Sequence, residues 1–196
     1  IMSVLKDAKW KLIDIKKRTI SRSPTAPFIT SSLQREASTK LGWPIAKTML
    51  VAKKLYEQGH ITYMRTDCTV LSEEAHKKIK DFVETHYGPT YYTYKQYTSK
   101  SANAQEAHEA IRPTYFNNHS AGTTPQEKKL YELIWKRAIA SQMSRAELEK
   151  TIISISNSNN SLKFKAEGEV LKFEGFLKVY LESTDDEEND ETAGML

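Results

Sequence analysis

The sequence predicts an α+β protein in which a mostly helical domain is inserted into a small antiparallel β domain. Strand-like patterns occupy both ends of the chain, four helical patterns lie between them, and no internal repeat occurs. The predicted β domain combines residues 1–26 with residues 147–196, including an acidic tail from residue 182, and the predicted helical domain spans residues 27–146. Insertion is the simplest architecture that places strand patterns on both sides of the helices.

The first predicted elements are a strand, a linker and two helices. Residues 1–20 alternate apolar residues imperfectly with lysine and aspartate, and residues 21–27 hold two prolines and three Ser or Thr residues. A helix is expected from a cap at Ser31 or Ser32 to Gly42. A second helix is expected over residues 44–58. Its predicted buried stripe is Ile45, Met49, Ala52 and Tyr56.

The third predicted helix is capped by Ser72 and closes at Gly88-Pro89. Its predicted buried face is Ala75, Ile79, Phe82 and Val83. Residues 91–97 hold four tyrosines, which indicate either a platform for unpaired bases or an exposed strand packing its rings on a neighbour. The fourth helix begins at Thr124-Pro125 and runs to about Ala146. Its predicted buried stripe is Leu130, Leu133, Ile134 and Ala138.

The remaining chain is predicted to form an antiparallel sheet. Residues 151–156 alternate as a strand, and a polar turn follows. Residues 162–166, 170–173 and 175–180 are expected to be further strands before the acidic tail.

Composition limits the class of protein. With 196 residues, 39% hydrophobic and 28% charged, the chain can bury a core. It has no apolar run of about twenty residues and no leader pattern, so no membrane association is expected. The single cysteine, Cys68, excludes an internal disulfide and a thiolate metal site, which is typical of the reducing cytoplasm.

The charge is distributed unevenly. The last fifteen residues hold seven of the 25 acidic residues and none of the 29 lysines and arginines, so residues 1–181 carry a net charge of +11. Such an excess indicates a polyanionic partner, of which nucleic acid is the commonest. An ordinary solvated lysine surface is the alternative that charge alone leaves open.

The segment Ile61–Asp67, ITYMRTD, is the first candidate for chemistry. Its residue types favour an extended backbone, in which Tyr63 and Arg65 share a face. A phenol is a poor nucleophile at neutral pH, whereas a neighbouring guanidinium favours the phenolate and also binds phosphate. This pair suits attack on phosphorus, although most tyrosines pack rather than react.

Residues 103–114 form the second candidate, and their alanines and glutamates favour one or two helical turns that end near Arg112. In a helix His108 and Arg112 lie on one face, where a nearby phosphate keeps the histidine more protonated. A short helix with a surface histidine is the simpler interpretation. Glu106 and Glu109 are left unassigned between metal binding, positioning of His108 and a solvated face.

These stretches resemble type IA DNA topoisomerases. ITYMRTD, framed by LYEQGH and CTVLSEEA, is similar to the active-site segment of that family, and QEAHEAIRP is similar to a second family motif. The likeness extends upstream through PFITSSLQREASTKLGWPIAKTML. The resemblance implies that Tyr63 opens one DNA strand by forming a 5′-phosphotyrosine and that Arg65 binds the phosphate. It implies DNA binding by Thr62, Thr66, His108 and Arg112.

The resemblance also implies that this chain is the gate fragment of a longer, ATP-independent enzyme. The expected partners are single-stranded DNA and the remaining domains of the same polypeptide, in the bacterial cytoplasm and nucleoid. Mg²⁺ is expected in a separate domain, and no metal or cofactor site is expected here, so the chain alone should be inactive. Met64 is more similar to topoisomerase I than to topoisomerase III, and Cys68 stands where serine is usual in the family.

Three alternatives remain at this point. A topoisomerase III-like member would share the chemistry. A non-catalytic single-stranded nucleic-acid-binding module would use Tyr63 only to stack a base. A protein-interaction scaffold would not bind DNA at all.

Overall fold

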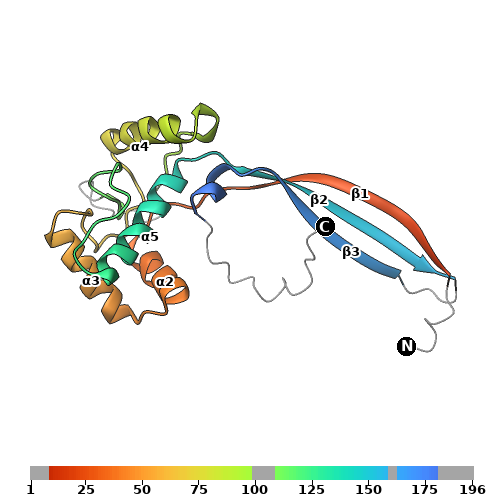
Figure 1. Cartoon of the computed structure of the whole chain (residues 1–196), viewed down its shortest axis with the longest axis horizontal. Helices are drawn as coiled ribbons and strands as arrows, with labels where there is room; N and C mark the ends of the chain where they lie inside the picture. The colour runs from red at the N-terminus through yellow and green to blue at the C-terminus, as the bar shows by residue number, and fades with distance from the viewer. Residues whose placement is uncertain (1–8, 99–108, 159–162, 181–196) are drawn as a thin grey trace. The chain divides into compact units, whose positions relative to one another are not determined.

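The computed structural model describes residues 9–98, 109–158 and 163–180, which form two compact units. One unit contains the described residues up to Arg22 and those from Ala146 to Glu174, and the other contains those from Ser23 to Arg145 and from Gly175 onward. The described elements are helices and an antiparallel sheet, so the predicted α+β class is confirmed (Figure 1).

The sheet unit is a ribbon of three strands in the order β1-β2-β3, with β1 at Trp10–Arg22, β2 at Ala146–Asn157 and β3 at Lys163–Phe173. Both pairings are antiparallel. Trp10 pairs with Asn157 and Arg22 pairs with Ala146, so β1 and β2 are joined through residues far apart in the sequence. The two short strands predicted within residues 162–173 are one continuous strand.

The strand predicted at residues 175–180 is wrong, because Gly175–Lys178 forms the short 3-10 helix η2. Gly175 has a φ of 51°, and a side chain there would meet the carbonyl oxygen of Arg145. The backbone N–H of Phe176 donates to the Ser144 carbonyl oxygen at 2.9 Å. Phe176 and Tyr180 are buried, so this segment turns away from strand geometry and belongs to the helical unit.

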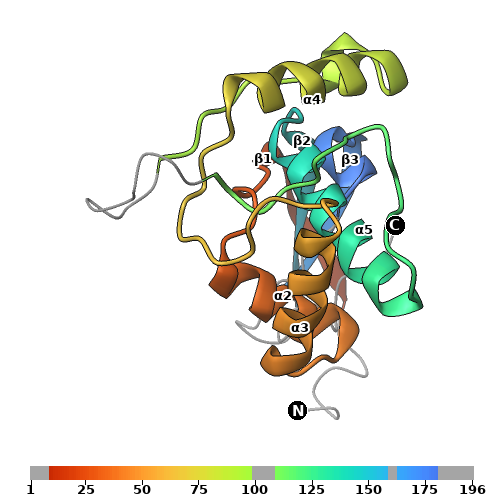
Figure 2. The same ribbon diagram turned by 90° about the vertical axis from the view of Figure 1, so that its left-hand side faces the viewer.

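The helical unit contains α2 (Thr30–Leu41), α3 (Ile45–Glu57), α4 (Glu73–His86) and α5 (Pro125–Ser141), together with the short 3-10 helix η1 (Pro89–Tyr91) (Figure 2). The predicted caps of α4 and α5 are confirmed. Ser72 accepts a hydrogen bond from the Ala75 N–H at 3.3 Å, and Thr124 accepts one from Glu127 at 3.2 Å. The buried faces predicted for both helices are confirmed as well.

Three predicted details of the helices are wrong. In α2 the cap position is Ile29 rather than Ser31 or Ser32. The Ser32 hydroxyl accepts a hydrogen bond from the Ile29 N–H at 3.0 Å. In α3 only Ala52 of the predicted stripe is buried, whereas Ile45 and Tyr56 are 59% and 42% exposed. The buried face is Thr48, Val51, Ala52 and Leu55. Apolar residues lie on both sides of α3, and contact with α2 and α5 selects between them.

The third wrong detail is the end of α5, which stops at Ser141 rather than near Ala146, where β2 begins. The tyrosine-rich segment after η1 is not a strand. Its Tyr92 forms an isolated bridge with Met143, and the Tyr97 hydroxyl donates to the carbonyl oxygens of Pro24 and Ser141 at 3.1 and 3.2 Å. Burial raises the pKa of Tyr97 to about 12, which agrees with a packed ring.

The helix predicted around Arg112 is wrong for its described part, residues 109–112, and residues 103–108 lie outside the described residues. The Ala110 N–H donates to the Val70 carbonyl oxygen at 2.9 Å, and the Ile111 N–H donates to that of Phe28 at 2.8 Å. Neighbouring segments thus satisfy the backbone that a helix would have satisfied internally. Pro113 also favours an extended conformation at the residue before it.

Candidate active site

The tyrosine segment Ile61–Asp67 alternates between solvent and core although only Ile61 forms a strand-type bridge. Tyr63 and Arg65 are exposed, whereas Met64 and Thr66 are 7% exposed each. The two side chains that the sequence selects for phosphate chemistry therefore lie toward solvent. The intervening buried residues anchor the segment to the core.

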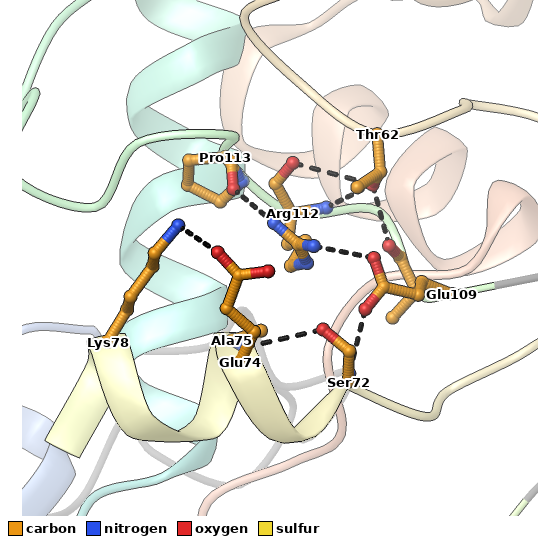
Figure 3. A network of polar contacts seen from close by, with 9 residues as sticks. Thr62, Ser72, Glu74, Ala75, Lys78, Glu109, Arg112 and Pro113 are labelled. Carbon is orange, nitrogen blue, oxygen red and sulfur yellow. Dashed lines mark hydrogen bonds and ion pairs between the residues drawn. The ribbon is translucent and has the colours of Figure 1, made fainter.

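The segment that follows Glu109 holds the tyrosine segment from one side. The Thr62 N–H donates to the Arg112 carbonyl oxygen and the Thr114 N–H donates to that of His60, both at 2.9 Å. The Thr62 hydroxyl donates to the Ala110 carbonyl oxygen at 2.7 Å and accepts from the Arg112 N–H at 2.9 Å. The two sequence motifs are therefore neighbours in space, and the Thr62 hydroxyl is used inside the protein (Figure 3).

Thr30, the first residue of α2, holds the same segment beyond Tyr63. Its hydroxyl donates to the Met64 carbonyl oxygen at 2.9 Å, and the Thr66 carbonyl oxygen is a second acceptor at 3.1 Å. The same hydroxyl accepts a hydrogen bond from the Thr66 N–H at 2.9 Å. The Thr30 N–H also donates to the Thr66 carbonyl oxygen at 2.9 Å. The Thr66 hydroxyl accepts from the Cys68 N–H at 3.0 Å, so it too is used internally.

Thr30 was not among the sequence candidates. Nothing in its local pattern distinguishes it from an ordinary residue in the first turn of a helix. Only the folded structure shows that it hydrogen-bonds a segment more than thirty residues away.

Arg112 lies in a polar network at the start of α4 (Figure 3). Its side chain is 15% exposed, and its guanidinium donates to Glu109 at 2.6 Å and to the Pro113 carbonyl oxygen at 3.0 Å. The Arg112 Nε is buried and has no hydrogen-bond partner among the described residues. The other Glu109 carboxylate oxygen accepts from the Ser72 N–H at 2.7 Å.

The network sets the charge state of Glu109. Burial alone raises the pKa of this carboxyl, but the hydrogen bonds from Ser72 and the charge of Arg112 outweigh burial and hold the pKa below its ordinary value. Glu109, which the sequence left unassigned, is therefore a carboxylate that binds Arg112. His108 lies outside the described residues.

Aromatic rings lie beside the candidate nucleophile. The Tyr56 ring meets the Tyr63 ring edge-on, with 5.2 Å between centroids. Tyr56 is the next-to-last residue of α3, and Gly59, with a φ of 75°, lets the chain leave that helix. The helix end thus places two exposed tyrosines together, at 42% and 41% exposure.

The described residues do not contain three or more His, Cys, Asp or Glu side chains placed to hold a metal ion. No chemical step is assigned to Mg²⁺ among these residues. Among the described helices, none combines the length and hydrophobicity that a membrane span requires.

Comparison with known proteins agrees with the two motifs. A family model described as DNA topoisomerase matches residues 1–195. A prokaryotic-type DNA topoisomerase 1 of Acanthamoeba polyphaga mimivirus is 46% identical over 186 residues, covering 90% of this chain and 22% of the relative. DNA topoisomerase 1 of Zymomonas mobilis is 43% identical over 190 residues, covering 96% of this chain and 16% of the relative.

A solved structure gives the same result. Full-length topoisomerase I from Thermotoga maritima superposes with a TM-score of 0.81 at 32% sequence identity, and the match covers all of this chain and 32% of that protein. The chain thus spans between a sixth and a third of the length of these relatives. The motifs, the family model and the fold agree, and the chain belongs to the type IA DNA topoisomerases.

Proposed function

We propose that this chain is the nucleophile-bearing part of a topoisomerase I that cleaves, passes and reseals DNA strands without ATP. The Tyr63 phenol oxygen attacks a backbone phosphorus, a new P–O bond forms, and the bond from phosphorus to the 3′ oxygen breaks. The products are a 5′-phosphotyrosine and a 3′-hydroxyl, with the phenol proton lost and a proton gained by the leaving oxygen. Resealing reverses these steps, because the phosphotyrosine retains the energy of the broken bond.

Exposure of Tyr63 and Arg65 on a segment held from both sides is the observation that supports this proposal. An exposed guanidinium two residues from the phenol can bind the phosphate oxygens and stabilise the charge that develops on them. A fixed backbone keeps the two groups in the relative position that the reaction needs.

The DNA-binding roles expected of the other residues are revised in this proposal. The hydroxyls of Thr62 and Thr66 already bind protein backbone, so we assign them to positioning of the segment. Arg112 is mostly buried in an ion pair with Glu109, so we assign it to holding the segment that pairs with Thr62 rather than to direct contact with DNA phosphate. Contact of His108 with DNA phosphate remains part of the proposal.

We propose single-stranded DNA as the substrate, since the proposed attack by Tyr63 cuts one strand and strand passage needs that strand to be opened. We place Mg²⁺ in the remaining domains of the same polypeptide. The bacterial cytoplasm and nucleoid are the proposed place of action, because the substrate lies there. The similarity to DNA topoisomerase 1 of other organisms favours topoisomerase I over a topoisomerase III-like role.

The exposed Tyr56–Tyr63 pair supports one competing function, a non-catalytic module that stacks single-stranded bases. A covalent adduct separates the two. The complete enzyme is incubated with a labelled single-stranded oligonucleotide, denatured, digested and analysed by mass spectrometry.

Under the catalytic proposal, wild type and Tyr56→Phe carry a nucleotide on Tyr63, whereas Tyr63→Phe forms no adduct and still binds the oligonucleotide. Tyr56→Phe is the matched control, because it removes the same hydroxyl from the neighbouring ring. An adduct of unchanged yield in Tyr63→Phe would contradict the proposal. Binding without any adduct in the wild type would favour the stacking module.

A further inference from the structure

Thr30 makes more hydrogen bonds to the tyrosine segment than its place in a helix requires. Its hydroxyl and its backbone N–H together bind the Met64 carbonyl oxygen and both backbone polar groups of Thr66, all at 2.9–3.1 Å. The bonded residues flank Arg65 on both sides. We propose that Thr30 is a positioning residue for Tyr63 and Arg65, an inference that rests on the function proposed above.

The geometry explains how one hydroxyl can act on two side chains that it does not touch. A hydrogen bond to the Met64 carbonyl oxygen fixes the peptide plane between Met64 and Arg65, and the bonds to Thr66 fix the chain just beyond. With the peptide planes on either side held, the direction in which Arg65 leaves the backbone is set. Tyr63 is restrained from the same side through the buried Met64.

Thr30 is itself held by the core. It begins α2, whose Leu33 and Ala37 are fully buried, and its neighbour Phe28 is fully buried as well. The hydroxyl is therefore attached to a rigid element rather than to a second loop. On the other side of Tyr63, the hydroxyl of Thr62, a residue of the segment itself, donates to the Ala110 carbonyl oxygen. Two threonine hydroxyls thus fix the backbone before and after the nucleophile.

A positioning role predicts a specific kinetic defect. Loss of the hydroxyl removes no side chain that contacts DNA, but it allows the tyrosine segment to move. Binding should be preserved while the chemical step slows, because misplacement of reacting groups by about 1 Å can cost on the order of a hundredfold in rate. A merely structural role would lower stability and affect binding and cleavage together.

The test uses the complete enzyme and three variants. Thr30→Val removes the hydroxyl and keeps the shape, Thr30→Ser keeps the hydroxyl, and Thr48→Val is the control. Thr48 is a fully buried threonine of α3 whose hydroxyl donates to the Pro44 carbonyl oxygen at 3.4 Å, so the control makes the same change away from the segment. Single-turnover cleavage at saturating oligonucleotide and the oligonucleotide Kd are measured for each.

Thr30→Val should cleave about tenfold to a hundredfold more slowly with a Kd within about twofold of wild type. Thr30→Ser should recover most of the rate, and Thr48→Val should cleave normally. A wild-type rate in Thr30→Val overturns the inference, as does a rate loss equal to that of Thr48→Val. If Thr30→Val does not fold, Thr30→Cys replaces it, since a thiol is only a weak hydrogen-bonding group.

Tyr63→Phe, run beside these variants, separates the two claims. If Tyr63→Phe forms no adduct and Thr30→Val cleaves normally, the positioning inference is wrong and the proposed function stands. If Tyr63→Phe still forms the adduct, the proposed function is wrong and the inference about Thr30 falls with it.

Discussion

The Glu109 carboxylate accepts a hydrogen bond from the Arg112 guanidinium at 2.6 Å. Its second oxygen binds the backbone N–H of Ser72, the cap residue of α4, at 2.7 Å. One side chain thus connects the start of α4 with the strand-like segment that pairs with Thr62. The same network neutralises a mostly buried arginine close to the tyrosine segment.

Replacing Glu109 should therefore destabilise the protein. Glu109→Ala leaves the Arg112 charge mostly buried and the Ser72 N–H without its acceptor, which should cost about 1–3 kcal/mol of unfolding free energy. Urea unfolding measures this loss. The control is Glu132→Ala, which removes an exposed pair with Lys136 on α5 and should cost less than about 1 kcal/mol. Equal losses in the two variants would contradict the role assigned to Glu109.

Acid should weaken the start of α5. Glu127 accepts hydrogen bonds from Thr123 and Thr124, and the bond from the Thr123 N–H is the main cause that lowers its pKa to about 2. A lowered pKa in the folded state stabilises the protein above the ordinary value of 4.5, and this contribution is lost as pH falls toward 2. The Tm difference between wild type and Glu127→Gln should be largest near neutral pH and shrink on acidification. A difference that stays constant with pH would exclude this linkage.

The thiol of Cys68 should be protected. Its side chain is 4% exposed, and its Sγ accepts a hydrogen bond from the Val70 N–H at 3.4 Å. Burial hinders the approach of a bulky disulfide reagent. The thiol should thus react at least about a hundredfold more slowly in the folded protein than in urea, since reaction requires local opening. Absorbance of the released thiolate measures the rate, and similar rates in both conditions would place the thiol at the surface.

Gly59 and Gly42 offer a matched pair of helix-end glycines. Their φ values are 75° and 65°, and an added side chain would meet no atom within 4 Å at either position. Alanine at either site should therefore cost about 1 kcal/mol through backbone strain alone. Only Gly59→Ala should also slow cleavage by the complete enzyme, because it precedes the tyrosine segment. Equal cleavage rates in the two variants would show that this turn does not influence Tyr63.

The 196-residue chain by itself should form no Tyr63 adduct. Cleavage needs a proton acceptor for the phenol and a donor for the leaving oxygen, whereas Arg65 supplies only charge stabilisation. We propose that the remaining domains supply the proton-transfer groups. Incubation of the purified chain with labelled single-stranded DNA tests this division. A robust adduct that disappears in Tyr63→Phe would show that the chain is sufficient.

Local patterns determined much of this protein. The caps at Ser72 and Thr124 and the buried faces of α4 and α5 follow from residue types a few positions apart, and the structure confirms them. The family also follows from contiguous motifs, one of which holds Tyr63 and Arg65 two residues apart. These features depend only on residues that are close together in the sequence.

Tertiary structure decided the rest. The apolar residues of α3 permit two buried faces, and packing against α2 and α5 chose the one containing Leu55. Residues 103–114 have helical composition, yet in their described part hydrogen bonds to Val70 and Phe28 hold Ala110 and Ile111 outside a helix. The bond from Thr30 to Met64 joins residues more than thirty positions apart. Such contacts form only when the whole fold brings the segments together, so no local pattern records them.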